Sequence, residues 1–158
     1  MKKLEIEFRD NGTGHKDIFL NISELKQTQV ADSYYLILDS KEETIKGAKK
    51  VLIKLLTYWI DIVSNLEQNQ VKNLPFDFSD QYLGGFQVSL TDDSRIALKY
   101  GFTLEIMGYS ISPSQPAKVN STPIIFKEDN RELDFFMNRA DLIDDITLSI
   151  ENIKAKIL

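Results

Sequence analysis

The spacing of hydrophobic and polar positions predicts one long helix in the first half of the chain. Between residues 40 and 68, apolar side chains recur at three- and four-residue steps, the period of a helix with one buried face. Ser40 and Glu43 form a Ser-x-x-Glu capping box, so we expect this helix to begin at Ser40. Trp59 lies in the middle of the apolar stripe. We interpret it as a core anchor, with a ligand-stacking role as the alternative.

A second helix is predicted near the end of the chain. Asn138 is a suitable N-cap, acidic residues follow it early, and lysines come late, as the helix dipole favours. The apolar positions form a narrow seam of isoleucines: Ile143, Ile146, Ile150, Ile153 and Ile157. This seam packs either beside the long helix within one chain, which we favour, or against its copy in a homodimer.

Alternating positions predict strands elsewhere. Residues 4–8 and 18–22 alternate on both sides of a turn-rich segment and predict an N-terminal hairpin. Residues 86–90 and 96–100 flank a four-residue turn and give the clearest hairpin in the chain. We interpret 33–38 as an inner strand, with a lead-in to the long helix as the alternative, and the polar segments 26–32 and 69–73 as connections. Short strands are also expected at 123–126 and 133–135.

This order of elements predicts an α+β fold in a single domain, residues 1–158. We expect a mostly antiparallel β-sheet, with the long central helix and the C-terminal helix packed on one face. The order strands, helix, strands, helix lacks the alternation of strand and helix that builds a parallel sheet.

Composition narrows the possible functions. The chain has 158 residues, of which 42% are hydrophobic, no cysteine, and a net charge of −5. The acidic balance argues against a nucleic-acid partner. The sequence has no apolar run of the roughly 20 residues that a membrane span needs, and its start lacks the apolar core of a signal peptide. We therefore expect a cytoplasmic protein that contacts neither nucleic acid nor membrane.

The most unusual stretch is residues 74–85, where aromatic and acidic residues alternate before two glycines. Such a segment can form a recognition patch for another protein, made by Phe76, Asp77, Asp80, Gln81 and Tyr82. The alternative is structural: the phenylalanines enter the core, the aspartates cap turns, and the glycines permit a bulge or close packing. Two aspartates three positions apart lack the remaining ligands of a calcium loop, so we predict no metal site.

Catalytic motifs are absent from the sequence. The one histidine, His15, lies in a turn-rich loop without a second histidine or a cysteine for a zinc site. No nucleophile elbow, phosphate loop or dinucleotide fingerprint is present, so we expect no cofactor and favour a non-catalytic protein.

Three functional hypotheses follow. The first is a protein-binding domain, of inhibitor or immunity type, that uses segment 76–82 against a protein partner, which charge complementarity would make basic. The second is a small-ligand or minor enzymatic domain with a pocket between sheet and helices, lined by Trp59, Tyr82 and Tyr100. The third is an oligomeric structural protein that assembles through the isoleucine seam.

Overall fold

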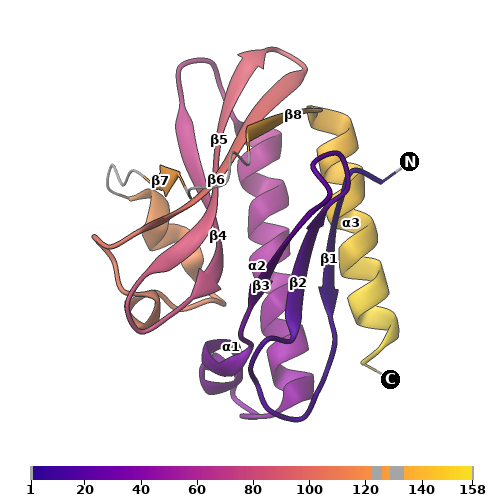
Figure 1. Ribbon diagram of the computed structural model, residues 1–158, viewed down its shortest axis with the longest axis vertical. Helices are drawn as coiled ribbons and strands as arrows, with labels where there is room; N and C mark the ends of the chain where they lie inside the picture. The colour runs from indigo at the N-terminus through magenta and orange to yellow at the C-terminus, as the bar shows by residue number, and fades with distance from the viewer. Residues whose placement is uncertain (1, 122–125, 129–133, 158) are drawn as a thin grey trace.

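The strands form two antiparallel sheets in the computed structural model, which describes residues 2–121, 126–128 and 134–157 (Figure 1). The first sheet has the order β1 (Leu4–Phe8), β2 (Ile18–Ile22) and β3 (Gln27–Ala31). The second has the order β4 (Val71–Phe78), β5 (Leu83–Asp92) and β6 (Arg95–Thr103). The short β7 (Lys127–Glu128) and β8 (Asp134–Asn138) both pair with β6 on its far side.

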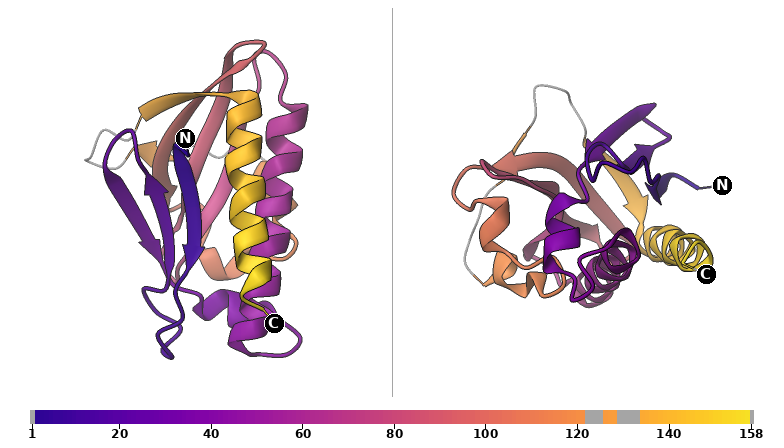
Figure 2. Two further views of the ribbon diagram at one scale, coloured as in Figure 1. Left: turned by 90° about the vertical axis from the view of Figure 1, so that its right-hand side faces the viewer. Right: turned by 90° about the horizontal axis from the view of Figure 1, so that it is seen from below.

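The described residues also form three α-helices: α1 (Tyr34–Asp39), α2 (Ile45–Asn65) and α3 (Arg139–Ala155). Two 3-10 turns, η1 (Gly108–Ser110) and η2 (Pro116–Asn120), lie in the connection after β6. Helices α2 and α3 run antiparallel, side by side (Figure 2). Their opposite ends are joined by Arg139, which donates to the Val63 carbonyl at 3.3 Å, and by Lys49, which donates to the Lys156 carbonyl at 3.4 Å. The α+β fold class is therefore confirmed, with the strands divided between two sheets.

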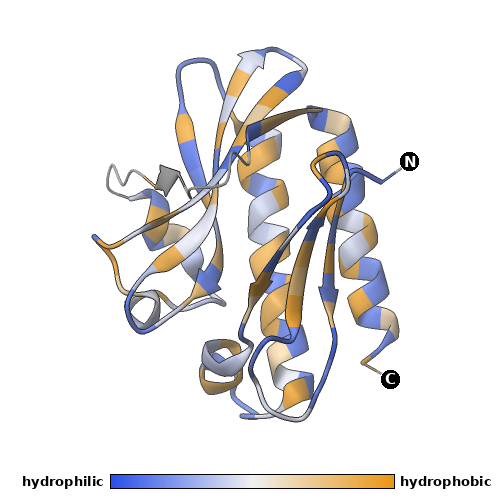
Figure 3. Ribbon diagram, viewed as in Figure 1, coloured by the Kyte–Doolittle hydropathy of each residue, from blue (hydrophilic) through white to orange (hydrophobic). Residues whose placement is uncertain are grey.

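The core forms where both sheets meet α2. Apolar and polar residues alternate along β1 (Figure 3). Every second residue of β1 and of β2 is buried. In the second sheet the contact with α2 is aromatic. The ring centroid of Trp59 lies 6.4 Å from that of Phe76 and 6.0 Å from that of Phe86, and Phe86 in turn packs on Tyr100 and Phe135. Aromatic pairs of this geometry contribute about 0.5–1.5 kcal/mol each beyond their burial, so the Trp59 cluster is a main attachment of this sheet to α2.

The predicted start of the long helix is wrong. Ser40 is the C-cap of α1, and its hydroxyl donates to the Ile37 carbonyl at 2.9 Å. Glu43 has a φ of +48°, which no helical residue adopts, so it cannot complete a capping box. The helix is capped by Thr44, whose hydroxyl accepts from the Gly47 N–H at 3.0 Å. A cap motif read from spacing alone cannot distinguish two helix boundaries that lie four residues apart.

Three local predictions are also wrong. Residues 34–38 lie in helix α1, with Ser33 as its N-cap. The strand was predicted because a run of only five apolar residues has no resolvable period. The polar segment 26–32 contains β3, an edge strand whose exposed positions accept polar side chains. Strand β4 begins at Val71, inside the predicted connection 69–73.

The predicted C-terminal helix and its Asn138 cap are confirmed, and the Asn138 side chain accepts from the Ala140 N–H at 2.9 Å. Its seam residues Ile146, Ile150 and Ile153 are buried within the chain. A homodimer through α3 stays a prediction and would have to use other residues of the helix. The expected strand at 123–126 lies outside the described residues except for Phe126, and β8 lies where the last strand was expected. Among the described residues, no helix combines the length and apolarity needed to cross a bilayer.

Candidate functional site

Segment 76–82 forms the end of β4 and the turn into β5. Phe76 and Phe78 are each 1% exposed, so both rings belong to the core and Phe76 is not part of a binding surface. Asp80 and Gln81 are exposed in the turn, which is closed by a hydrogen bond from the Ser79 N–H to the Tyr82 carbonyl at 3.1 Å. The segment thus combines both interpretations of its sequence: the phenylalanines are structural, and the polar residues after them face solvent.

A bulge in β4 and a glycine in β5 set the shape of this turn. The β4–β5 register shifts between Pro75 and Asp77, as the two glycines suggested. A β-carbon added to Gly85 would lie 2.1 Å from the Leu74 carbonyl oxygen, so the two strands can approach this closely only with glycine at this position. Its neighbour Gly84 is less crowded. The nearest atom to a β-carbon added there would be in the side chain of Asp77, at 3.2 Å. Asp77 follows the bulge directly and lines a cavity.

Asp77 and Tyr82 meet across the turn. The Tyr82 hydroxyl donates to the Asp77 carboxylate at 2.9 Å. Burial raises the pKa of Asp77 to about 6, against the Tyr82 hydrogen bond, which lowers it, and with the nearby Asp32 charge raising it. Burial together with the charge of Asp77 raises the pKa of Tyr82 to about 12. Asp77 is therefore a carboxylate that the fold holds in a site unfavourable to its charge.

A cavity of about 520 Å³ opens beside this pair, between β3 and the second sheet. Its walls come from the exposed edge of the first sheet on one side and from β5 and β6 on the other. The residues that line it are Thr28, Gln29, Val30, Asp77, Tyr82, Gly84, Tyr100, Gly101 and Phe102. Its volume falls within the range of about 300–1,000 Å³ typical of small-ligand sites.

A second cavity of about 880 Å³ adjoins the first and shares Val30, Asp77 and Tyr82 with it. It extends past the turn toward the start of α1 and adds Asp80 and Asp32 to the lining. Because the two cavities share these three residues, we refer to them together as the inter-sheet cleft.

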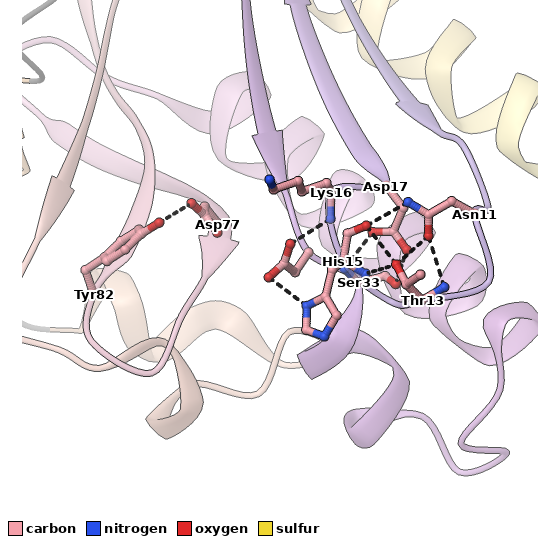
Figure 4. A network of polar contacts seen from close by, with 9 residues as sticks. Asn11, Thr13, His15, Lys16, Asp17, Ser33, Asp77 and Tyr82 are labelled. Carbon is pink, nitrogen blue, oxygen red and sulfur yellow. Dashed lines mark hydrogen bonds and ion pairs between the residues drawn. The ribbon is translucent and has the colours of Figure 1, made fainter.

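The far wall of the inter-sheet cleft is the loop between β1 and β2, anchored near α1. The His15 ring nitrogen lies 3.1 Å from the Asp32 carboxylate, and its ring stacks on Tyr34 with centroids 5.7 Å apart. Behind it, buried Asp17 accepts from the Ser33 N–H at 2.9 Å and from its hydroxyl at 2.6 Å. Figure 4 shows the Asp77–Tyr82 pair on the hairpin side and His15 on the opposite loop. The wall is thus held in place by charged and polar contacts.

Of the three residues predicted to line a pocket between sheet and helices, Trp59 lies in the core. Trp59 is fully buried, and its indole N–H donates to the Pro75 carbonyl at 2.9 Å, so it is a core anchor. Tyr82 and Tyr100 do line a cavity, but this cavity lies between the two sheets. Among the described residues, no group of three His, Asp or Glu side chains could hold a metal ion.

Sequence reasoning brought Asp77, Asp80 and Tyr82 together because they are neighbours along the chain. It missed His15, Asp32 and Tyr34 as members of the same site. The only local signal was the concentration of turn-forming residues around His15, which marks a loop but not what the loop faces. Only the arrangement of the two sheets places this loop opposite the β4–β5 turn.

Comparison with known proteins gives a fold but no family. No family model and no curated protein matches the sequence. A solved chain of the CdiA-CT/CdiI toxin and immunity complex from Enterobacter cloacae has a similar structure, with a TM-score of 0.53 and 12% identity. The match covers 96% of this chain and 99% of that chain. At this identity the likeness shows that the fold is shared along nearly the whole of both chains.

Proposed function

We propose that this protein binds and inhibits another protein in the cytoplasm, in the manner of an immunity protein, and that the inter-sheet cleft is its binding surface. The observation that carries the proposal is the chemistry of this cleft. Acidic Asp32, Asp77 and Asp80 lie beside the partly exposed rings of Tyr34 and Tyr82. Aromatic residues supply binding energy at interfaces, and acidic residues select a basic partner and speed association.

Two further observations support an inhibitory role. The chain carries a net charge of −5, which favours association with a basic protein. Its fold is shared with a chain of the CdiA-CT/CdiI toxin and immunity complex, and the match extends over 96% of this chain. An inhibitor without chemistry of its own needs only a rigid scaffold and a surface complementary to its target.

The test is affinity capture from the source cell's lysate at low and at high salt, followed by mass spectrometry and reconstitution with the purified partner. We expect one stoichiometric basic partner that is released at high salt, because screening weakens charge complementarity. The partner's activity, or its toxicity on expression, should fall when this protein is added. A captured protein whose activity is unchanged would contradict inhibition.

The surface is tested by the double substitution Asp80→Lys and Gln81→Lys, both at exposed turn positions. We expect weaker partner binding at an unchanged melting temperature. The control with the same change in charge is Asp144→Lys with Thr147→Lys, two exposed residues of α3 outside the cleft. Equal loss of binding in both double variants would indicate a general charge effect and contradict the assignment of the surface.

A small-ligand function is the second candidate, and the cavity of about 520 Å³ favours it. Here no protein partner is needed, and a compound that fits between Val30 and Tyr100 should raise the melting temperature. Screening of a metabolite library by thermal shift, with Gly84→Leu to fill the cavity as control, distinguishes this candidate. A stabilising compound that acts equally on the filled variant would not be bound in the cavity.

A further inference from the structure

We propose that the cavity beside Asp77 receives a cationic side chain of the partner, and specifically the guanidinium group of an arginine. This inference rests on the proposed function and states which chemical group the inter-sheet cleft recognises. Its support comes from the charge of the cavity, the partners of Asp77, and the aromatic rings around it.

The first argument is the charge of the cavity. Among the described residues that line the 520 Å³ cavity, Asp77 is the only carboxylate, and none is a lysine, arginine or histidine. Among the described residues, Asp77 has Tyr82 as its one hydrogen-bond partner and has no ion-pair partner. A partly buried carboxylate without a cation is costly unless something else supplies the charge. A cation from a bound partner would supply it.

The second argument is the geometry of the walls. The rings of Tyr82 and Phe102 lie edge to face with centroids 6.0 Å apart, and Tyr100 lines the same cavity. A guanidinium is planar, stacks on aromatic faces, and can bind a carboxylate through two parallel N–H groups. An ammonium group offers neither the plane nor the paired donors. The combination of one carboxylate and several rings therefore favours arginine over lysine.

The third argument is the protonation of Asp77. Its pKa is raised to about 6, chiefly by burial, and an adjacent cation would lower it again. Cation binding should therefore strengthen as the pH rises through 6. Other groups also face the cleft: Tyr82, Tyr100, Asp32, Asp80, His15 and Lys16. Because the His15 ring lies 3.1 Å from the Asp32 carboxylate in the same cleft, the variant His15→Gln separates its effect from that of Asp77.

The experiment uses a free arginine derivative, so that it does not depend on knowing the partner. N-acetyl-arginine amide is titrated into the full chain and followed by NMR, with the carboxyl carbon of Asp77 as reporter. N-acetyl-lysine amide tests the ammonium, and N-acetyl-citrulline amide offers nearly the same shape without the charge. We expect the arginine derivative to shift the signals of Asp77, Tyr82 and Val30, to lower the pKa of Asp77, and to bind at least tenfold more tightly than the citrulline derivative.

The variant Asp77→Asn keeps an oxygen that can accept from Tyr82 and removes the charge. We expect it to lose arginine binding by at least tenfold, while Asp93→Asn, at the exposed hairpin tip, leaves binding unchanged. Binding of citrulline equal to that of arginine, shifts confined to residues outside the cavity, or unchanged binding in Asp77→Asn would each overturn the inference. If a protein partner is captured but the arginine derivative does not bind, the inference fails and the proposed function stands. If the arginine derivative binds in the cavity and no protein partner exists, the cavity does recognise a guanidinium group and the proposed function fails.

Discussion

Asp145 in α3 accepts a hydrogen bond from the backbone N–H of Leu4 at 3.0 Å, across 141 positions of the chain. The same carboxylate oxygen accepts from the Lys3 N–H at 2.9 Å, and one turn later the Ser149 hydroxyl accepts from the Ile6 N–H at 3.0 Å. These contacts satisfy the outer edge of β1, which would otherwise present unpaired donors. Helix α3 therefore closes the first sheet as a neighbouring strand would.

Removal of the Asp145 carboxylate should destabilise the protein. Asp145 is 7% exposed, and Asp145→Ala leaves the buried Leu4 N–H without its acceptor. A hydrogen bond to a charged group contributes about 1.5–3 kcal/mol, so we expect a loss of about 2–3 kcal/mol in the free energy of unfolding. Urea denaturation measures it, with the exposed neighbour Asp144→Ala as control, for which a change within about 0.5 kcal/mol is expected. Similar losses in both variants would mean that Asp145 acts through helix charge and not through β1.

The raised pKa of Asp77 predicts a pH dependence of stability. In the unfolded chain this carboxyl ionises near pH 4, and in the folded protein its pKa is about 6. A raised carboxyl pKa favours folding while the group is protonated, so this contribution is complete below pH 4 and is lost as the pH rises through 6. The variant Asp77→Asn has no carboxyl group at this position, so its stability does not fall in this way as the pH rises.

Urea denaturation of both proteins at pH 4 and pH 7 tests this sign. From pH 4 to pH 7, the free energy of unfolding of Asp77→Asn should rise relative to that of the native protein by at most about 3 kcal/mol. This limit corresponds to a shift of about two pKa units, each equal to 1.36 kcal/mol. The exposed Asp93→Asn should show no such gain. Parallel profiles for Asp77→Asn and the native protein would show that the carboxyl is not held in an unfavourable site.

The adjacent glycines of β5 should respond differently to the same substitution. A β-carbon at Gly85 meets a backbone carbonyl of β4, which cannot move without breaking the strand pair, whereas at Gly84 it meets the side chain of Asp77. We expect Gly85→Ala to cost about 3 kcal/mol or more and Gly84→Ala about 1 kcal/mol, by the usual cost of overpacking. Thermal unfolding measures both, and equal costs would contradict the close approach of β4 to Gly85.

The core role of Trp59 predicts the effect of Trp59→Phe. The substitution removes the donor to the Pro75 carbonyl and leaves a void against Phe76 and Phe86. We expect a loss of about 2–4 kcal/mol, from the unmade hydrogen bond and the cavity together. Because Trp59 is the one tryptophan of the chain, circular dichroism must follow the unfolding. Tyr109→Phe, at a 63% exposed ring, is the control and should leave stability unchanged.

Periodicity predicted the elements whose stability comes from a long regular pattern. The interior of α2, the β5–β6 hairpin and α3 with its Asn138 cap were all predictable, because each shows several repeats of one period. Helix α1 and strand β3 were not, because each has only five or six residues and depends on tertiary contacts. The bond from Ser33 to Asp17, for example, fixes the start of α1 and joins positions 16 apart.

The candidate site was likewise predictable from the sequence only in part. The Asp77–Tyr82 contact spans five positions and could be suspected from sequence, since both residues lie in one unusual segment. The opposite wall with His15 and Asp32 could not, because it belongs to the other sheet.

The closure of β1 by α3 has a consequence for synthesis of the chain. The ribosome adds about 5–20 residues per second, so on the order of 10 s pass between the appearance of Leu4 and that of Asp145. During that interval β1 has at most β2 as a partner, and its other edge can pair with any extended strand nearby. The nascent chain therefore passes through a period of exposure to aggregation that ends only when its last helix emerges, and slowing translation of that helix should increase the demand for chaperones.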